Sequence, residues 1–322
     1  MRYPHTFVTR VNFVNFDESG LRRYPGAMIE AEFIAALRRL PLHPGALGLA
    51  DDVARLGDHI LTTDTLVEGV HFLAGDPPDD VAWKLVATNL SDLAAKGARP
   101  DGVLLNYPLG ADEWDRAFLA GLAAALAAFD CALLGGDTVS LPAGAPRVLT
   151  LTAIGADAIA PARSGAVPGD DLWVTGTIGD AGAGLAIARG AAGPATLLAA
   201  YRRPIPRIEE GRLLAPHLHA MMDVSDGLLI DAWRMAAASG CAVTIDLALM
   251  PLSADYRTFG GDALAAATAG DDYELLFAAA PDAPIPVPAT RVGKFSAGKG
   301  LSLTERGNAV PLPPRLGFEH RA

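Results

Sequence analysis

The chain has 322 residues, a formal net charge of −11 and two cysteines. This length suits two medium domains better than one. The negative charge argues against a nucleic-acid surface, which needs a basic patch, and two cysteines give neither a disulfide framework nor a CxxC metal site. No apolar run reaches the roughly 20 residues of a membrane helix. We therefore expect a cytoplasmic protein with no nucleic-acid or membrane partner.

The first 27 residues do not connect in composition to the sequence that follows. They lack the basic region and apolar core of a signal peptide, and a helical pattern begins only at Met28. The apolar positions of that pattern are Ile29, Phe33, Ile34 and Leu37. We expect Met28 to be the natural start and residues 1–27 to be an N-terminal extension.

Strands and helices alternate along the rest of the chain. In the first half the patterns predict strands at residues 59–63, 102–107, 131–134 and 148–154, and helices at residues 79–96 and 113–129. A stretch rich in Gly, Pro and Ala at residues 155–171 marks the expected domain boundary. In the second half the patterns predict strands at residues 172–175, 242–247 and 273–277, and helices at residues 207–218 and 228–238. The alternation predicts an α/β or α+β fold, with domains at residues 28–158 and 159–322.

Aspartates fall where these elements begin, end or turn. Asp64 and Asp137 each follow an apolar strand, and Asp92 lies on a predicted helix. The others are Asp51, Asp52, Asp223, Asp226, Asp271 and Asp272. Unpaired carboxylates are rarely buried, and lysines and arginines are too sparse nearby to pair them all. Divalent cations with oxygen ligands fit best, and Mg²⁺ is usual where phosphates complete the shell. Histidine and cysteine do not cluster, so zinc is not expected.

Each aspartate also has a plain structural explanation. An Asp before a helix is most often an N-cap, and an Asp in a turn is most often a turn former. Asp226, next to Gly227 and a helix, fits a cap. Asp64 and Asp137 are harder to explain in this way, because the Gly135-Gly136 pair before Asp137 would let the backbone approach a ligand closely.

Two glycine-rich segments have competing explanations. Residues 293–300 (GKFSAGKG) nearly fit a Walker A loop, but Gly300 stands where Ser or Thr is needed, and no strand-loop-helix context surrounds them. Residues 176–184 lie between a strand and a helix, so their amides can bind an anion. They lack GxGxxG spacing, so close helix-strand packing is an equal explanation. With no GxSxG elbow and no reactive cysteine context, the sequence predicts no covalent nucleophile.

Seven motifs together resemble the thiamine-monophosphate kinase family, from about Met28 to the C-terminus. In chain order they are TTDTLVEGVHF (62–72), NLSDLAAKGARP (89–100), GGDT (135–138), RSGAVPGD (163–170), VTGTIGDAGAGL (174–185), DVSDGL (223–228) and GDDYEL (270–275). The first two are highly specific; the wider superfamily of aminoimidazole-ribonucleotide synthetase shares only the general layout.

The resemblance implies a two-domain, aminoimidazole-ribonucleotide-synthetase-like fold in a homodimer, with the N-terminal domains paired. ATP and several Mg²⁺ ions would lie in a cleft beside that interface. The implied reaction converts ATP and thiamine monophosphate into ADP and thiamine diphosphate by direct transfer, without a phosphoenzyme. Phosphoryl transfer needs two phosphates held in line and their charge neutralised, so a chain of net charge −11 can bind two anions through bridging metals.

The resemblance also implies roles for particular residues. The ATP-binding positions are Asp52, Gly136, Asp137, Arg163 and Ser225. The metal-binding positions are Asp52, Thr62, Thr63, Asp64, Asp92, Asp137, Asp223 and Asp226. The positions that contact thiamine monophosphate are His71, Asp271 and Phe318, of which Phe318 rests on the short string GFEH.

Two residues depart from the family pattern. Ala50 replaces a glycine before the first aspartate pair, so the loop must shift if that glycine needs a positive φ. Asp271 stands where the family usually has Glu, and the shorter side chain would make a direct substrate contact water-mediated. These changes bear on affinity more than on reaction class.

Two alternatives remain open. The first is another ATP-dependent enzyme of the superfamily; a selenophosphate synthetase would need a reactive cysteine near the N-terminus, and a synthetase of the aminoimidazole-ribonucleotide type is not expected to carry the first two motifs. The second is a non-catalytic, nucleotide-binding homologue. The retained aspartates argue against it, because an inactive site has no need for so much uncompensated negative charge.

Overall fold

The computed structural model describes residues 15–16, 22–23 and 30–319. The chain divides into two compact units, residues 1–42 with 319–322 and residues 43–318. The described part of the first unit contains the antiparallel pair β1 (Asn15–Phe16) and β2 (Arg22–Arg23) and helix α1 (Glu30–Leu37). Helix α1 confirms the helical pattern expected there. Met28, the expected start, and most of the expected extension lie outside the described residues.

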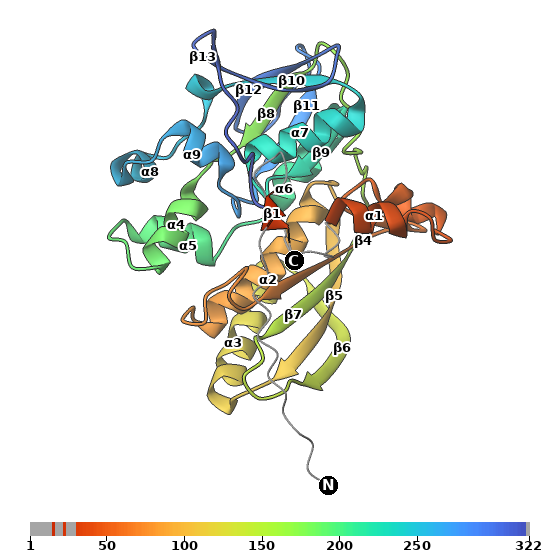
Figure 1. Cartoon of the computed structure of the whole chain (residues 1–322). Coiled ribbons are helices and arrows are strands. Elements are labelled where there is room, and N and C mark those ends of the chain that lie inside the picture. Colours follow the sequence, from red (N-terminus) through yellow and green to blue (C-terminus); the bar gives the residue numbers. More distant parts are fainter. Residues whose placement is uncertain (1–14, 17–21, 24–29, 320–322) are drawn as a thin grey trace. The chain divides into compact units, whose positions relative to one another are not determined.

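The larger unit begins with a five-stranded sheet (Figure 1). Its order is β3 (Ala54–Leu56), β4 (His59–Val67), β7 (Val148–Ala156), β5 (Arg99–Leu109) and β6 (Ala132–Ser140). Strands β5 and β6 are parallel and the other pairs are antiparallel. Helix α2 (Pro78–Ala94) packs on the sheet, and α3 (Asp112–Ala128) packs alongside α2. Apolar residues of the sheet and both helices form one core.

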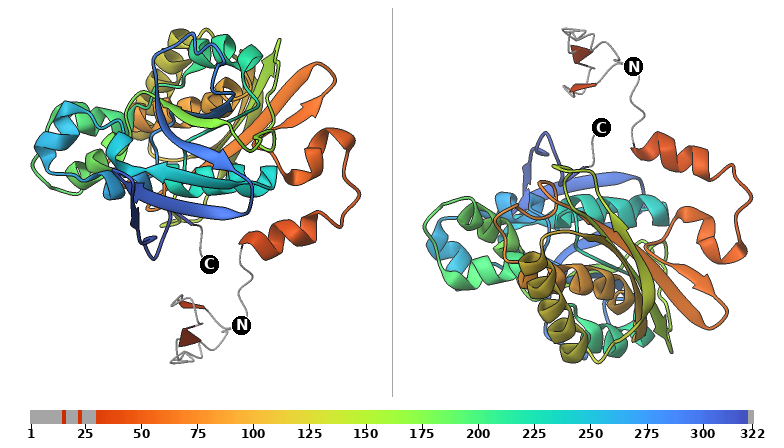
Figure 2. Two further views of the ribbon diagram at one scale, coloured as in Figure 1. Left: turned by 90° about the horizontal axis from the view of Figure 1, so that it is seen from above. Right: turned by 90° about the horizontal axis from the view of Figure 1, so that it is seen from below.

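A seven-stranded mixed sheet follows. Its order is β14 (Asn308–Val310), β13 (Gly300–Glu305), β10 (Ala242–Asp246), β12 (Ala289–Ser296), β8 (Asp171–Thr175), β11 (Leu275–Ala279) and β9 (Ala220–Asp223). Helix α7 (Leu228–Ser239) packs on this sheet, and its apolar face joins a second core. Figure 2 shows the same strands and helices from above and below.

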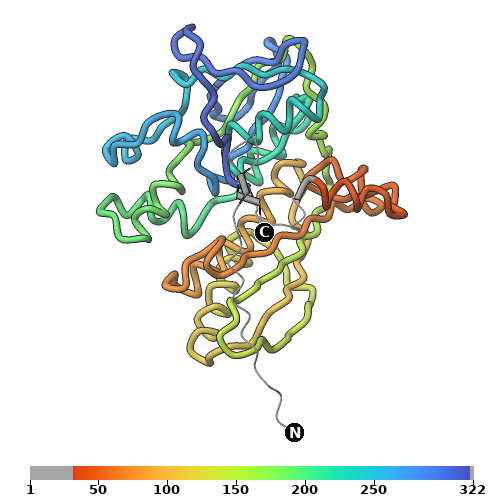
Figure 3. Tube along the Cα trace, viewed as in Figure 1, coloured from red at the N-terminus to blue at the C-terminus, as the bar shows by residue number. Residues whose placement is uncertain are grey.

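Shorter helices complete the unit. Helices α4 (Asp180–Ala188), α5 (Ala195–Arg202) and α8 (Ala254–Phe259) contact one another. The remaining elements are α6 (Ile208–Leu214), α9 (Ala263–Thr268) and the 3₁₀ turns η1 (Pro44–Leu49), η2 (Ala215–His217) and η3 (Leu247–Leu249). The Cα trace in Figure 3 follows the chain between the two sheets. In the described part of the chain, no helix is long and apolar enough to cross a membrane.

The mixed α/β fold predicted from the sequence is confirmed, with two corrections at strand ends. Strand β4 continues to Val67 and β6 continues to Ser140, so Asp64 and Asp137 lie within strands instead of after them. Both strands continue because they remain paired with neighbours, β4 with β7 and β6 with β5. The Walker-like segment 293–300 forms the end of β12 and the start of β13 and does not lead into a helix.

Candidate functional site

Four of the predicted aspartates act electrostatically on one another although they come from distant parts of the chain. Asp52 precedes β3, Asp64 lies on β4, Asp92 lies on α2 and Asp223 ends β9. Burial raises the pKa of Asp64 to about 6, and the charges of Asp52 and Asp226 add to this effect. The fold therefore gathers carboxylates at the junction of β4, α2 and β9.

Two further members of this cluster, Asp223 and Asp92, also have raised pKa values. Burial raises the pKa of Asp223 to about 8, with further contributions from the charges of Asp52, Asp231 and Asp64. The pKa of Asp92 lies well above its ordinary value, because of burial and then the charges of Asp64, Asp223 and Asp52. Strongly perturbed carboxylates of this kind are typical of functional sites.

Helix α2 aligns part of the site along one face. Thr62 on β4 donates a hydrogen bond from Oγ1 to Asp92 Oδ2 at 2.5 Å. The backbone N–H of Asp64 donates to Asn89 Oδ1 at 3.0 Å. Asn89 and Asp92 are three residues apart and share a helix face, which β4 crosses. These two bonds fix Thr62 and Asp64 against the helix.

The loop that carries Asp51 and Asp52 is held by two cations. Lys96 Nζ lies 2.6 Å from Asp51 Oδ1 and 3.4 Å from Asp52 Oδ2, and Arg163 pairs with Asp52 Oδ1. Burial raises the pKa of Asp52, but the charges of Lys96 and Arg163 outweigh it and leave the pKa lowered. Ala50 has a φ of −115°, so its replacement of glycine needs no positive φ.

The segment between β9 and α7 is held by a carboxylate that the sequence reasoning missed. Asp231 is fully buried, and its Oδ2 accepts hydrogen bonds at 3.2 Å from the backbone N–H groups of Ser225, Asp226 and Gly227. Arg234 bonds to both Asp226 and Asp231. The signal in the sequence was an Asp in the first turn of a helix, which favours contact with the preceding amides.

Two of the predicted substrate residues, His71 and Asp271, contact a buried lysine that was also missed. Lys84 Nζ, on α2, donates to Asp271 Oδ2 at 2.7 Å and to the carbonyl oxygen of His71 at 3.1 Å. The hydroxyl of Tyr273 donates to Asp271 Oδ1 at 3.0 Å. Phe318 donates its backbone N–H to the carbonyl of Asp226 at 2.9 Å. Lys84 therefore joins the segments that carry His71 and Asp271.

Two predicted metal positions lie apart from this cluster. The side chains of Thr62 and Thr63 point to opposite faces of β4, and Thr63 Oγ1 instead donates to the carbonyl of Leu151 on β7 at 3.2 Å. Asp137 is exposed on the edge strand β6, and β5 and β7 separate it from β4. Three strand spacings correspond to about 14 Å.

The structure explains two glycine-containing motifs whose role the sequence left open. A Cβ at Gly136 would lie 1.8 Å from the carbonyl oxygen of Leu105, so the pairing of β6 with β5 itself requires glycine. In the 176–184 loop, the N–H of Gly179 donates to both carboxylate oxygens of Asp272 at 3.0 Å. The anion bound by that loop is thus a side chain of the same chain.

The donor set fits Mg²⁺ better than a softer metal. The clustered side chains offer only carboxylate and hydroxyl oxygens, which hard cations prefer. Among the described residues, no three His, Cys, Asp or Glu side chains already form a complete metal cage. Mg²⁺ commonly keeps several waters and binds through one or two carboxylates plus phosphates, so an incomplete cage of aspartates suits it.

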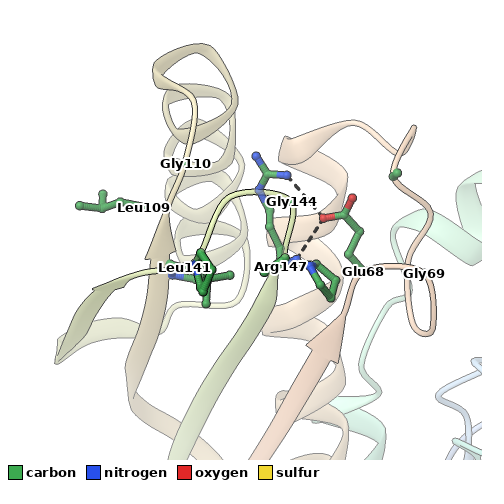
Figure 4. A pocket seen from close by; sticks show the side chains of 12 residues that line it. Glu68, Gly69, Leu109, Gly110, Leu141, Gly144 and Arg147 are labelled. Carbon is green, nitrogen blue, oxygen red and sulfur yellow. Dashed lines mark hydrogen bonds and ion pairs between the residues drawn. The ribbon is translucent and has the colours of Figure 1, made fainter. Parts of the chain in front are cut away.

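A separate pocket of about 610 Å³ lies where β4, β5 and β6 end and β7 begins (Figure 4). Its two charged residues, Glu68 and Arg147, pair with each other at 3.5 Å, and Arg147 also stacks on Trp114. The pocket contains none of the predicted site residues. Glu68 and Arg147 offset each other's charge, although Arg147 Nε is buried without a hydrogen-bond partner. We assign the pocket no ligand.

Comparison with known proteins places this site in a family. The family models for AIR synthase related protein match residues 50–156 (N-terminal domain) and 167–307 (C-terminal domain). The thiamine-monophosphate kinase of Caulobacter vibrioides is 41% identical, over 92% of each chain. The chain belongs to the thiamine-monophosphate kinase family.

Solved structures agree with this membership. A structure described as AaThiL complexed with AMPPCP and TMP is 28% identical with a TM-score of 0.81, covering 91% of this chain and 97% of that one. The thiamine-monophosphate kinase of Stenotrophomonas maltophilia is 36% identical with a TM-score of 0.69, covering 86% and 96%. The resemblance drawn from the seven motifs is confirmed.

Proposed function

We propose that this chain transfers the γ-phosphate of ATP to thiamine monophosphate and releases ADP and thiamine diphosphate. The observation that carries the proposal is the cluster of Asp64, Asp92 and Asp223, in a member of this kinase family. A related structure contains an ATP analogue and TMP. We further propose a cytoplasmic location and two domains, residues 28–158 and 159–322, after an N-terminal extension.

We propose that several Mg²⁺ ions bind at the aspartates and neutralise the phosphates of both substrates. Such ions supply the charge stabilisation that phosphoryl transfer needs. The metal-binding residues would be Asp52, Thr62, Thr63, Asp64, Asp92, Asp137, Asp223 and Asp226. Thr62 and Asn89 would hold Asp92 and the backbone of Asp64 in place, as they do here, and Asp231 would fix the loop of Asp223 and Asp226.

The nucleotide would contact the residues that flank this cluster. Arg163, next to Asp52, would place its guanidinium on a phosphate, where the fork of donors matches phosphate oxygens. Arg163 Nε is buried without a hydrogen-bond partner, which supports a further acceptor there. Ser225, whose amide is held by Asp231, would contact the nucleotide. Gly136 and Asp137, which lie apart from this cluster in one chain, are the remaining nucleotide positions that the resemblance implies.

Thiamine monophosphate would bind beside Lys84. His71 would donate to the substrate, because its Nδ1 already accepts from the N–H of Val67 at 3.0 Å and the proton then belongs on Nε2. Asp271 would act through water, since Lys84 and Tyr273 already occupy its two oxygens. The ring of Phe318 would cover the thiamine rings.

Transfer would be direct. A phosphate oxygen of thiamine monophosphate would attack the γ-phosphorus while the bond to ADP breaks, and no side chain would carry the phosphoryl group. An isotopically chiral γ-phosphate tests this step, because one in-line transfer inverts the configuration at phosphorus. Retention would instead require a phosphoenzyme and would contradict the direct route.

We propose that the protein is a homodimer paired through the first sheet. Strand β6 is exposed along its whole length and includes Leu133, Leu134 and Val139, which are 52%, 55% and 47% exposed. An open apolar edge strand invites pairing with a second copy. Such pairing would also bring Asp137 of β6 to the interface beside which the ATP site is proposed.

Leu133→Asp is expected to dissociate the dimer, because it buries a charge in the paired edge. Sedimentation at micromolar concentration should show a shift to monomer. Leu119→Asp, at an exposed leucine on α3, is the matched control and should leave the mass unchanged. A wild-type protein that sediments as a monomer would overturn the dimer.

Lys84→Met is expected to raise KM for thiamine monophosphate about tenfold or more, equivalent to about 1.4 kcal/mol of lost binding, with a smaller change in KM for ATP. The buried ammonium holds both His71 and Asp271, and these two residues are proposed to contact thiamine monophosphate. Steady-state kinetics with each substrate varied gives both constants. Lys294→Met, at an exposed lysine of β12, should change neither KM value. Equal increases in the two KM values for Lys84→Met would contradict a role of Lys84 that is selective for thiamine monophosphate.

The proposed reaction is tested by incubating purified protein with ATP, Mg²⁺ and thiamine monophosphate. Mass spectrometry should detect thiamine diphosphate in step with ADP release, and EDTA should abolish both. ATP binding without any thiamine diphosphate would contradict the proposal and favour a non-catalytic homologue.

A further inference from the structure

A lysine ammonium is buried within the candidate site. Lys96 follows helix α2, four residues after Asp92, and its side chain is only 1% exposed. A buried ammonium is costly unless charges and hydrogen bonds compensate it. The groups that surround Lys96 therefore show which charges its ammonium neutralises.

Four oxygen atoms from three parts of the chain surround this ammonium. Asp51 Oδ1 lies at 2.6 Å and Asp52 Oδ2 at 3.4 Å. The carbonyl oxygens of Met221, on β9, and Pro161 lie at 3.1 Å and 3.3 Å. Carboxylate and carbonyl oxygens of this kind are also the protein ligands of hard cations, so the chain surrounds Lys96 much as it would surround a bound metal.

Apart from Asp226, which pairs with Arg234, the clustered aspartates fall into two groups by their contacts with cations. Asp51 and Asp52 contact Lys96, and Asp52 also contacts Arg163. In the described part of the chain, no ion pair joins the second group to a lysine or arginine. That group comprises Asp64, Asp92 and Asp223.

We propose that Lys96 is a fixed cation that takes the place of one divalent ion beside Asp51 and Asp52. This inference rests on the proposed function, in that it takes the aspartate cluster as the site of metal and ATP. An ammonium is a compact point charge that cannot dissociate from the chain, so this half of the site remains neutralised without metal. Mg²⁺ then binds at Asp64, Asp92 and Asp223, and the role of Asp52 narrows to holding Lys96 and Arg163. Lys96 is a positioning residue.

The inference is tested by counting bound metal in Lys96→Met, which removes the charge and keeps the apolar stem. Mn²⁺ is titrated by electron paramagnetic resonance in the presence of a non-hydrolysable ATP analogue. We expect one more Mn²⁺ per chain than in the parent protein, and a several-fold higher Mg²⁺ concentration for half-maximal rate. Lys294→Met is the matched control and should bind the parental number. An unchanged count in Lys96→Met would overturn the inference.

A double variant keeps the test valid if Lys96→Met does not fold. Lys96→Met with Asp51→Asn removes both partners of the 2.6 Å pair, while Asp52 keeps Arg163. The double variant should fold and bind the parental number of Mn²⁺, and Lys96→Gln should bind one more. A parental count in Lys96→Gln would contradict the proposal. Because counting needs no turnover, a failure of thiamine monophosphate as substrate would leave this test unaffected.

Discussion

Asp92→Asn is expected to lower the rate of thiamine diphosphate formation by about 10²–10³-fold or more, the scale of losing one stabilising group in a preorganised site. Asp92 interacts with Asp64, Asp223 and Asp52, so its carboxylate is coupled to each of the other three clustered aspartates. The same change should raise the melting temperature of the metal-free protein, because it removes mutual repulsion between buried carboxylates. Coupled assays of ADP release and thermal melts in EDTA measure the two effects.

The control for this variant is Asp282→Asn, an exposed aspartate between β11 and β12. It should leave both rate and melting temperature unchanged. Gain of stability with loss of activity is the pattern of a site kept strained for function. If Asp92→Asn lost stability and activity together, Asp92 would be a structural residue and its place in the site would be wrong.

The metal-free protein is expected to lose stability as the pH rises from about 4 to about 8. The pKa values of Asp64 and Asp223 are about 6 and about 8 in the folded chain, against an ordinary value of 3.8. Between these values the folded chain binds more protons than the unfolded chain, so rising pH favours unfolding by about 1.4 kcal/mol per pH unit for each proton. The stability that these raised pKa values contribute is complete below pH 3.8. It is lost as the pH rises past the pKa values of the two groups in the folded chain.

Thermal melts in EDTA between pH 4 and pH 8.5 measure this dependence. Asp223→Asn should reduce the slope between about pH 6 and pH 8, where Asp231, with a pKa raised by burial to about 7, still contributes. Asp282→Asn should keep the parental slope. Mg²⁺ with an ATP analogue should reverse the slope, since metal needs the ionised carboxylates. A stability that rises with pH in EDTA would contradict the raised pKa values.

The sequence predicted the alternating elements and the family well, because apolar periodicity and motif order are local properties. It also predicted one metal site for Asp64, Asp92 and Asp223. The structure brings these three carboxylates together from three elements, and their role in binding metal stays a prediction. It placed Asp64 and Asp137 after strands and not within them, because strand pairing, which decides where a strand ends, depends on distant partners.

The residues that support the site were not predictable in the same way. Lys84, Lys96 and Asp231 read as ordinary residues of amphipathic helices, since only tertiary packing shows that they are buried among polar groups. The sequence indicated that position 136 needs glycine, but it did not show why. The structure assigns this requirement to the close approach of Leu105, whereas the sequence suggested a bound ligand.

The role of Asp92 and Asp223 as metal ligands is tested most directly by a crystal structure with Mn²⁺ and a non-hydrolysable ATP analogue, measured at the manganese absorption edge. We expect anomalous peaks about 2.1 Å from carboxylate oxygens of Asp92 and Asp223, beside the nucleotide phosphates. Metal peaks that touch only the phosphates, with these aspartates left uncoordinated, would contradict the account.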